Sequence, residues 1–117
     1  MELKVASGDI TQAQADTILV NLFEGVQQPS GATAAVDQAL DGAISYLIQA
    51  GEVKGKAGEA TVVHTFGKLP ALRVVVVGLG KQEDLKADTV RKAAGNVARR
   101  VRALGARKVA TVVHGAG

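Results

Sequence analysis

The hydrophobic positions of this chain fall into short aliphatic runs, separated by two longer segments in which they recur at helical spacing. Five runs have the length and the β-branched content of strands. They cover residues 2–6, 17–22, 60–66, 72–80 and 108–113. The second and fourth runs are almost continuously aliphatic, which is typical of strands that are buried on both faces of a sheet.

The first helical segment follows a loop that is rich in glycine, proline and serine. Ser30 is expected to cap this helix, because its hydroxyl can accept a hydrogen bond from an amide of the first turn. Gly51 is expected to end it. The apolar positions at helical spacing are Ala35, Val36, Ala39, Leu40, Ala43, Leu47 and Ile48.

The second helical segment covers residues 85–104. We expect Asp84 or Asp88 to cap its start and Gly105 to end it. Its apolar stripe consists of Val90, Ala93, Ala94, Val97, Val101 and Leu104. The predicted order is therefore β-β-α-β-β-α-β, which favours an α/β fold with a mixed sheet flanked by helices.

Composition narrows the possible classes of protein. A chain of 117 residues with 47% hydrophobic and 21% charged residues is expected to form one globular domain, residues 1–117. Aromatic residues make up only 3%, which disfavours a base-stacking surface for single-stranded nucleic acid. The sequence has no cysteine, no signal-peptide pattern at its start and no apolar stretch of membrane-spanning length. We therefore expect a cytoplasmic protein without a membrane partner.

The stretch VVVVGLGK, residues 74–81, is a candidate phosphate loop, since glycine-rich turns after strands can offer backbone amides to a phosphate. It departs from the known fingerprints, which would place glycine where this chain has Glu83 or Val75. The alternative is a tight turn in which only glycine fits. His64 and His114 have no neighbouring ligands in the sequence, so neither a metal site nor a catalytic residue is predicted.

A basic segment without acidic residues extends from Arg91 to Lys108, in a chain whose net charge is +3. The candidate basic surface on the second helix consists of Arg91, Lys92, Arg99, Arg100 and Arg102. Two interpretations stay open, a surface for nucleic acid or an acidic partner, and an ordinary solvated helix face.

Three stretches carry a resemblance to a known family: residues 15–25, 34–81 and 85–109. Their order, together with the junction GEVKGKAGE (residues 51–59) and the VVVVGLGK turn, resembles the amino-terminal domain of the leucyl (cytosol) aminopeptidase family. The resemblance implies a three-layer fold like that of macro domains, followed in the family by a separate catalytic domain. Whether the last helix of the domain lies outside this chain stays open.

The resemblance also implies partners and cofactors. In the family, two divalent metals such as zinc or manganese lie in the catalytic domain, where they support the removal of amino-terminal residues. The chain itself would carry no cofactor and no catalytic residue. Its expected partners are its own catalytic domain and the sister subunits of a hexamer. The expected function is thus non-catalytic, in assembly or interaction.

Kinship with macro domains implies a second hypothesis, a stand-alone module that binds ADP-ribose or a related nucleotide. A macro domain has a Gly-Asp-Ile-Thr turn, then a Val-Asn-Ala-Ala-Asn motif with two asparagines, a triple-glycine loop and a later glycine-rich loop. The residues that match these features are Asp9, Ile10, Asn21, Gly31, Gly115 and Gly117. Glu24 replaces a second asparagine and the triple-glycine loop is reduced to Gly31, and both changes disfavour an anionic diphosphate. Nucleic-acid binding through the basic helix is the third hypothesis.

Overall fold

A computed structural model describes residues 1–6 and 8–112 of the chain. Its centre is a five-stranded sheet with the order β1-β5-β2-β4-β3. The strands are β1 (Glu2–Val5), β2 (Thr17–Leu22), β3 (Ala60–His64), β4 (Arg73–Gly78) and β5 (Lys108–Thr111). All neighbouring strands are parallel except β3, which pairs antiparallel with β4 and forms one edge of the sheet. The predicted mixed sheet is confirmed.

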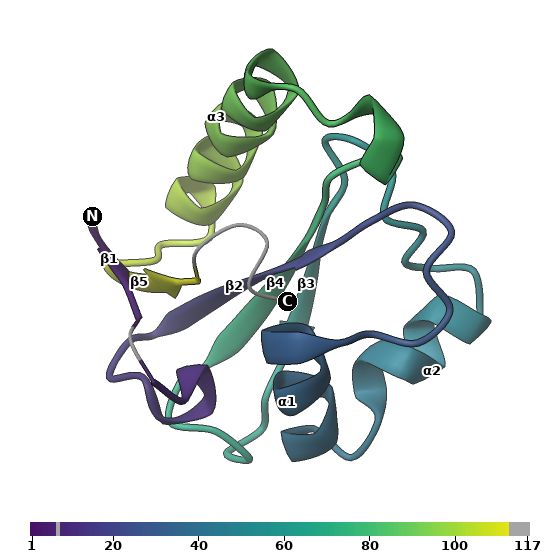
Figure 1. The fold of residues 1–117 in the computed structure, drawn as a ribbon. Coiled ribbons are helices and arrows are strands. Elements are labelled where there is room, and N and C mark those ends of the chain that lie inside the picture. Colours follow the sequence, from purple (N-terminus) through teal and green to yellow (C-terminus); the bar gives the residue numbers. More distant parts are fainter. Residues whose placement is uncertain (7, 113–117) are drawn as a thin grey trace.

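Helices cover the sheet from both sides, which gives three layers (Figure 1). The helices are α1 (Gly31–Ala39), α2 (Ala43–Gln49) and α3 (Ala87–Ala103), with short 3-10 turns η1 (Ile10–Gln12) and η2 (Gln82–Asp84). Among the described residues, no helix has the length and apolar character that crossing a membrane requires.

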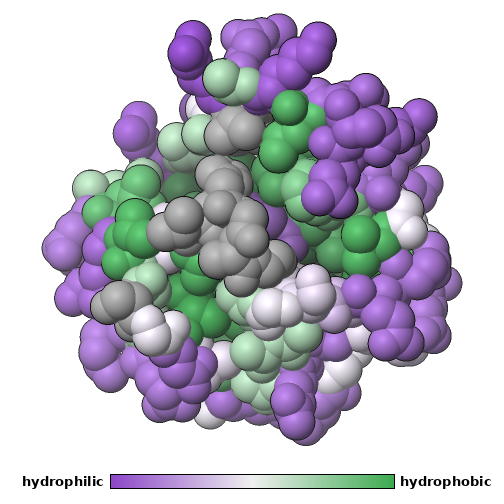
Figure 2. All heavy atoms as spheres, viewed as in Figure 1, coloured by the Kyte–Doolittle hydropathy of each residue, from purple (hydrophilic) through white to green (hydrophobic). Residues whose placement is uncertain are grey.

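The two faces of the sheet form two separate hydrophobic clusters. Val74 and Val76 of β4 pack in the cluster that includes α1, α2 and η1, whereas Val75 and Val77 pack in the cluster that includes α3. Successive side chains of a strand point to opposite faces, so an uninterrupted aliphatic run supplies both clusters. The outer rim of the molecule is mostly hydrophilic in the view of Figure 2, with apolar residues nearer its centre.

The prediction of a single helix between Ser30 and Gly51 is wrong, because the structure has two helices there, α1 and α2. The break lies at Asp41 and Gly42, whose φ angles of 56° and 83° are left-handed. Apolar spacing continues across the break and therefore did not reveal it. The local sequence Asp-Gly is a common turn signal, and it outweighs the helical periodicity here.

Asp37 holds the break in place. Its carboxylate accepts hydrogen bonds from the amide of Ser45, at 2.9 Å, and from the Ser45 hydroxyl, while its carbonyl accepts the amide of Gly42 at 2.8 Å. Asp37 thus satisfies one of the free amides at the start of α2. Ser30 occupies the predicted position before α1, but its side chain makes no capping hydrogen bond.

The helix predicted for residues 85–104 is α3 in the structure, and it begins later than expected, at Ala87. Lys86, not Asp84 or Asp88, occupies the position before its first turn, so the predicted cap is wrong. Its predicted end is confirmed, since Gly105 follows the last turn with a φ of 81°. Four strands are shorter than expected: β1 ends at Val5, β4 covers only Arg73–Gly78 and β5 ends at Thr111. The strand β3 ends at His64, before Phe66, whose φ of 51° turns the chain.

Candidate functional site

A surface hollow beside the start of α1 brings together three of the six residues predicted to bind a nucleotide. Asp9, Ile10 and Gly31 line this hollow, which has a volume of about 410 Å³. The same hollow is bordered by Gly8 and Ala32. The Gly-Asp-Ile-Thr turn and the lone glycine of the first loop therefore lie together, as the resemblance to macro domains implies. Gly115 and Gly117 lie outside the described residues.

The side chain of Asp9 is oriented by its own turn. Its Oδ1 atom accepts hydrogen bonds from the hydroxyl of Thr11, at 2.6 Å, and from the amide of Thr11, at 3.0 Å. These two bonds, the hydroxyl first, hold the pKa of Asp9 below its ordinary value. Asp9 is therefore a fixed anion at the rim of the hollow. Ile10 is only 2% exposed and serves the hydrophobic core.

Asn21 lies away from this hollow. On β2, Val20 and Leu22 pack with α1 and α2, so Asn21 belongs to the opposite face of the sheet. There it lines an apolar cavity of about 480 Å³ between α3 and the sheet. Its backbone carbonyl accepts a hydrogen bond from the hydroxyl of Thr33, at 2.7 Å. The structure thus does not bring Asn21 and Asp9 into one cavity.

The glycine turn after β4 uses its amides inside the fold. The amide of Gly78 donates to the carbonyl of Glu59 at 2.7 Å, that of Leu79 to Leu22 at 3.0 Å and that of Gly80 to Gly55 at 2.8 Å. A phosphate cradle needs amides that point at the ligand. These three amides already have backbone acceptors, so the structure supports the tight turn over the phosphate loop.

Close packing explains why these positions are glycine. A Cβ atom at Gly78 would lie 2.1 Å from the carbonyl oxygen of Lys56, and one at Gly55 would lie 2.5 Å from the carbonyl oxygen of Phe23. The carboxylate of Glu59 closes the same loop, since it accepts the amides of Lys54 and Gly55, both at 2.9 Å. The two motifs that carry the resemblance, residues 51–59 and 74–81, are thus the two halves of one packed junction. Sequence reasoning had treated them separately.

The five residues of the predicted basic surface are all exposed on α3. Lys92 pairs with Asp88 at 3.4 Å, and the guanidinium of Arg99 donates to the side chain of Asn96. Arg91, Lys92 and Arg99 border a shallow hollow of about 380 Å³ around Gly95. This placement is compatible with both interpretations of the basic surface.

Neither histidine lies in a cluster of ligands. His64 is exposed at the end of β3, and His114 lies outside the described residues. Within the part of the chain that the structure describes, no group of three or more histidine, cysteine or acidic side chains is placed to hold a metal ion.

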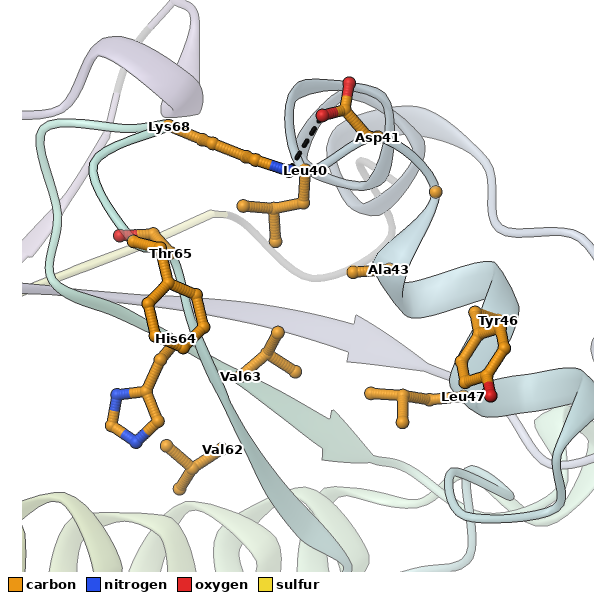
Figure 3. Close-up of a pocket in the computed structure, with 12 residues that line it drawn as sticks. Leu40, Asp41, Ala43, Tyr46, Leu47, Val62, Val63, His64, Thr65 and Lys68 are labelled. Carbon is orange, nitrogen blue, oxygen red and sulfur yellow. Dashed lines mark hydrogen bonds and ion pairs between the residues drawn. The ribbon is translucent and has the colours of Figure 1, made fainter.

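Sequence reasoning missed the hollow between α2 and the edge strand β3, shown in Figure 3, which has a volume of about 520 Å³. Tyr46 and Leu47 from α2 and Val62 and Val63 from β3 line it. An ion pair between Lys68 and Asp41, at 2.8 Å, lies at its end. The sequence contains one tyrosine and two phenylalanines, and this scarcity is the only signal that could have drawn attention to Tyr46 and Phe66. Both line the hollow, and their exposed fractions are 72% and 89%.

Comparison with known proteins agrees with this geometry. Residues 19–116 match the model of the "Cytosol aminopeptidase family, N-terminal domain". The chain is similar to a probable cytosol aminopeptidase of Alkaliphilus oremlandii, with 35% identity over 115 residues, which are 98% of this chain and 23% of the relative. The chain belongs to the cytosol aminopeptidase family, as an amino-terminal domain that spans about a quarter of the curated relatives it matches.

Solved structures show the same fold. The macrodomain of Mycobacterium tuberculosis DarG has a TM-score of 0.75 and 20% identity, covering 98% of this chain and 79% of the macrodomain. A leucine aminopeptidase variant from tomato has a TM-score of 0.71 and 16% identity, covering 100% of this chain and 24% of the enzyme. These likenesses confirm the predicted macro-domain-like architecture.

Proposed function

We propose that this chain is a non-catalytic assembly and interaction domain of a cytosol aminopeptidase. In this proposal the parent enzyme removes amino-terminal residues with two divalent metals that a separate catalytic domain holds. The partners are that catalytic domain and sister subunits, and the place of action is the cytoplasm, in line with the name of the relatives.

The observation that carries the proposal is the packed glycine junction. The amides of Gly78, Leu79 and Gly80 and the carboxylate of Glu59 lie in this junction, near the end of β4. All of them bind backbone groups of the same domain. Groups that hold loops together in this way support a scaffolding role better than a chemical one.

Two experiments test the proposal. The purified chain, incubated with leucyl-anilide and added manganese, should show no turnover above the buffer. Measurable hydrolysis that survives further purification would contradict a non-catalytic role.

For assembly, the region matched by this chain is deleted from the Alkaliphilus oremlandii relative. Light scattering should then find a smaller oligomer than for the complete relative, and an unchanged oligomer would overturn the assembly role.

A second candidate function is the binding of ADP-ribose or a related nucleotide. The observation that favours it is the hollow in which Asp9, Ile10 and Gly31 meet. Calorimetric titration with ADP-ribose would support it through micromolar binding that is lost in Asp9→Ala. An absence of heat with the wild-type chain would leave the assembly role as the function.

A further inference from the structure

The edge strand β3 has backbone groups that face away from the sheet. Hydrogen bonds from Thr65 to Leu72, at 3.1 Å, and from Gly78 to Glu59, at 2.7 Å, mark the two ends of its ladder with β4. In an antiparallel ladder, hydrogen-bonded pairs alternate with non-hydrogen-bonded pairs. Residues 59, 61, 63 and 65 therefore bond to β4. The amides and carbonyls of Ala60, Val62 and His64 point outward.

This edge lacks the usual protection against pairing. Natural edge strands are commonly blunted by lysine, proline or other charged residues. Residues 60–66, ATVVHTF, contain no lysine, arginine, aspartate, glutamate or proline, and they are rich in β-branched side chains. Two copies of this segment can approach each other without charge repulsion.

We propose that the free edge of β3 pairs antiparallel with β3 of a second copy of this chain, with the two-fold axis at Val62. The outward residues are arranged symmetrically about this position. Val62 of one copy then exchanges both of its hydrogen bonds with Val62 of the other, and Ala60 exchanges its bonds with His64. Every outward amide and carbonyl of the strand finds a partner in this one register, which makes a second copy the best-fitting occupant.

Exposed aromatic side chains extend the contact beyond the strand. Phe66 lies two positions after the end of β3, and it lines the same hollow as Tyr46 of α2. A large aromatic side chain buries about 150–250 Å². The area that two such side chains and one short strand can bury is smaller than the roughly 800 Å² per partner of a standard stable interface. The dimer of the isolated chain is accordingly expected to be weak.

The inference rests on the assembly role proposed above and gives that role a surface. The two can fail separately. A chain that stays monomeric overturns β3 pairing but leaves assembly through other surfaces, and the deletion test on the relative does not depend on β3 alone.

The test is sedimentation equilibrium of the chain from about 10 µM to about 1 mM, combined with amide hydrogen exchange at both concentrations. We expect a monomer–dimer equilibrium. At the high concentration the amides of Ala60, Val62 and His64 should gain protection, whereas those of Thr61 and Val63, already bonded to β4, should not change. A monomer throughout, or a dimer without this alternating pattern, overturns the proposal.

Two variants address the register. Val62→Pro removes an outward amide without removing a bond to β4, and proline is tolerated on edge strands. Val62→Lys places two like charges opposite each other at the axis. Each should raise the Kd at least about tenfold while the thermal unfolding of the monomer stays cooperative. Val62→Ile, which keeps the amide and the β-branched shape, is the matched control and should dimerise like the wild type. A folded Val62→Lys variant with wild-type dimerisation contradicts the proposal.

Discussion

The Oδ2 atom of Asp16 accepts a hydrogen bond from the backbone amide of Lys108 at 2.8 Å, across a separation of 92 positions in the chain. The same oxygen accepts the amide of Arg107 at 2.9 Å, and Oδ1 accepts the hydroxyl of Thr17 at 2.7 Å. The guanidinium of Arg73 pairs with Oδ1 at 3.4 Å. One carboxylate thus joins the starts of β2, β4 and β5, which fixes the centre of the sheet.

Replacing Asp16 should destabilise the whole domain. In Asp16→Ala, the amides of Arg107 and Lys108 and the hydroxyl of Thr17 lose their acceptor, whereas the guanidinium of Arg73 keeps the hydroxyl oxygen of Thr17. A donor left unsatisfied in a buried position costs about 1–3 kcal/mol, and the exposed Arg107 amide costs less because water can replace its acceptor. We expect the free energy of unfolding to fall by about 2–4 kcal/mol, measured by urea denaturation. Asp88→Ala is the matched control, because its pair with Lys92 is exposed and should be worth less than about 1 kcal/mol. Equal losses in the two variants would contradict a central role for Asp16.

The same carboxylate should make the fold sensitive to acid. Burial acts to raise the pKa of Asp16, but the hydrogen bonds from Lys108, Thr17 and Arg107 and the charge of Arg73 outweigh it and hold the pKa below the ordinary 3.8. A carboxyl group whose pKa is lowered by folding stabilises the fold at pH values above its ordinary pKa. This stabilisation is lost as the pH falls through the pKa of the folded state. The free energy of unfolding should therefore decrease as the pH falls below about 4.

Asp16→Asn tests this pH dependence. Its unfolding free energy should change less over the same acidic range than that of the wild type. Asp9, whose pKa is also lowered, leaves a residual slope in the variant. Denaturation curves at several acidic pH values and at pH 7 supply the comparison, and identical slopes in both proteins would rule out Asp16 as a source of acid sensitivity.

Two glycines should respond to alanine in opposite directions. Gly78→Ala forces a Cβ atom against the carbonyl of Lys56, 2.1 Å away, and should cost about 3 kcal/mol or more. Gly95 lies within α3, and the nearest atom to its added Cβ would be Nη1 of Arg99 at 3.8 Å. Gly95→Ala should therefore gain about 0.5–1 kcal/mol through helix propensity. Melting temperatures of the two variants check both signs, and a tolerated Gly78→Ala would disprove the packed junction.

Phe66 combines a strained backbone with an exposed side chain. Its φ of 51° is unfavourable for a bulky residue, and its ring has a tilted contact with His64 at a centroid distance of 6.2 Å. Phe66→Gly relieves the backbone and should raise the unfolding free energy by about 0.5–1 kcal/mol. Phe66→Ala removes the ring but keeps the strain, so it should not stabilise the domain. Thermal unfolding separates the two, and a Phe66→Ala variant as stable as Phe66→Gly would show that strain is not the cause.

The aliphatic runs and their order with the helical segments were sufficient to predict the strands and a mixed sheet flanked by helices, and the resemblance added the three-layer architecture. The order and spacing of residues 15–25, 34–81 and 85–109 were sufficient for the family. The end of α3 at Gly105 was likewise local information, since glycine after a last helical turn readily adopts a left-handed conformation.

Other features depended on contacts between distant segments. The amides of Gly78 and Gly80 donate to Glu59 and Gly55, because a loop of residues 54–59 packs against the turn after β4. Strand order is equally non-local: β5, last in sequence, lies between β1 and β2, and β3 is left at the edge. Hydrophobic pattern specifies which residues are buried, but not which neighbours satisfy their backbone groups. The tertiary structure decided that Asn21 faces away from the hollow of Asp9 and Gly31, and that none of the described strands pairs with the outer edge of β3.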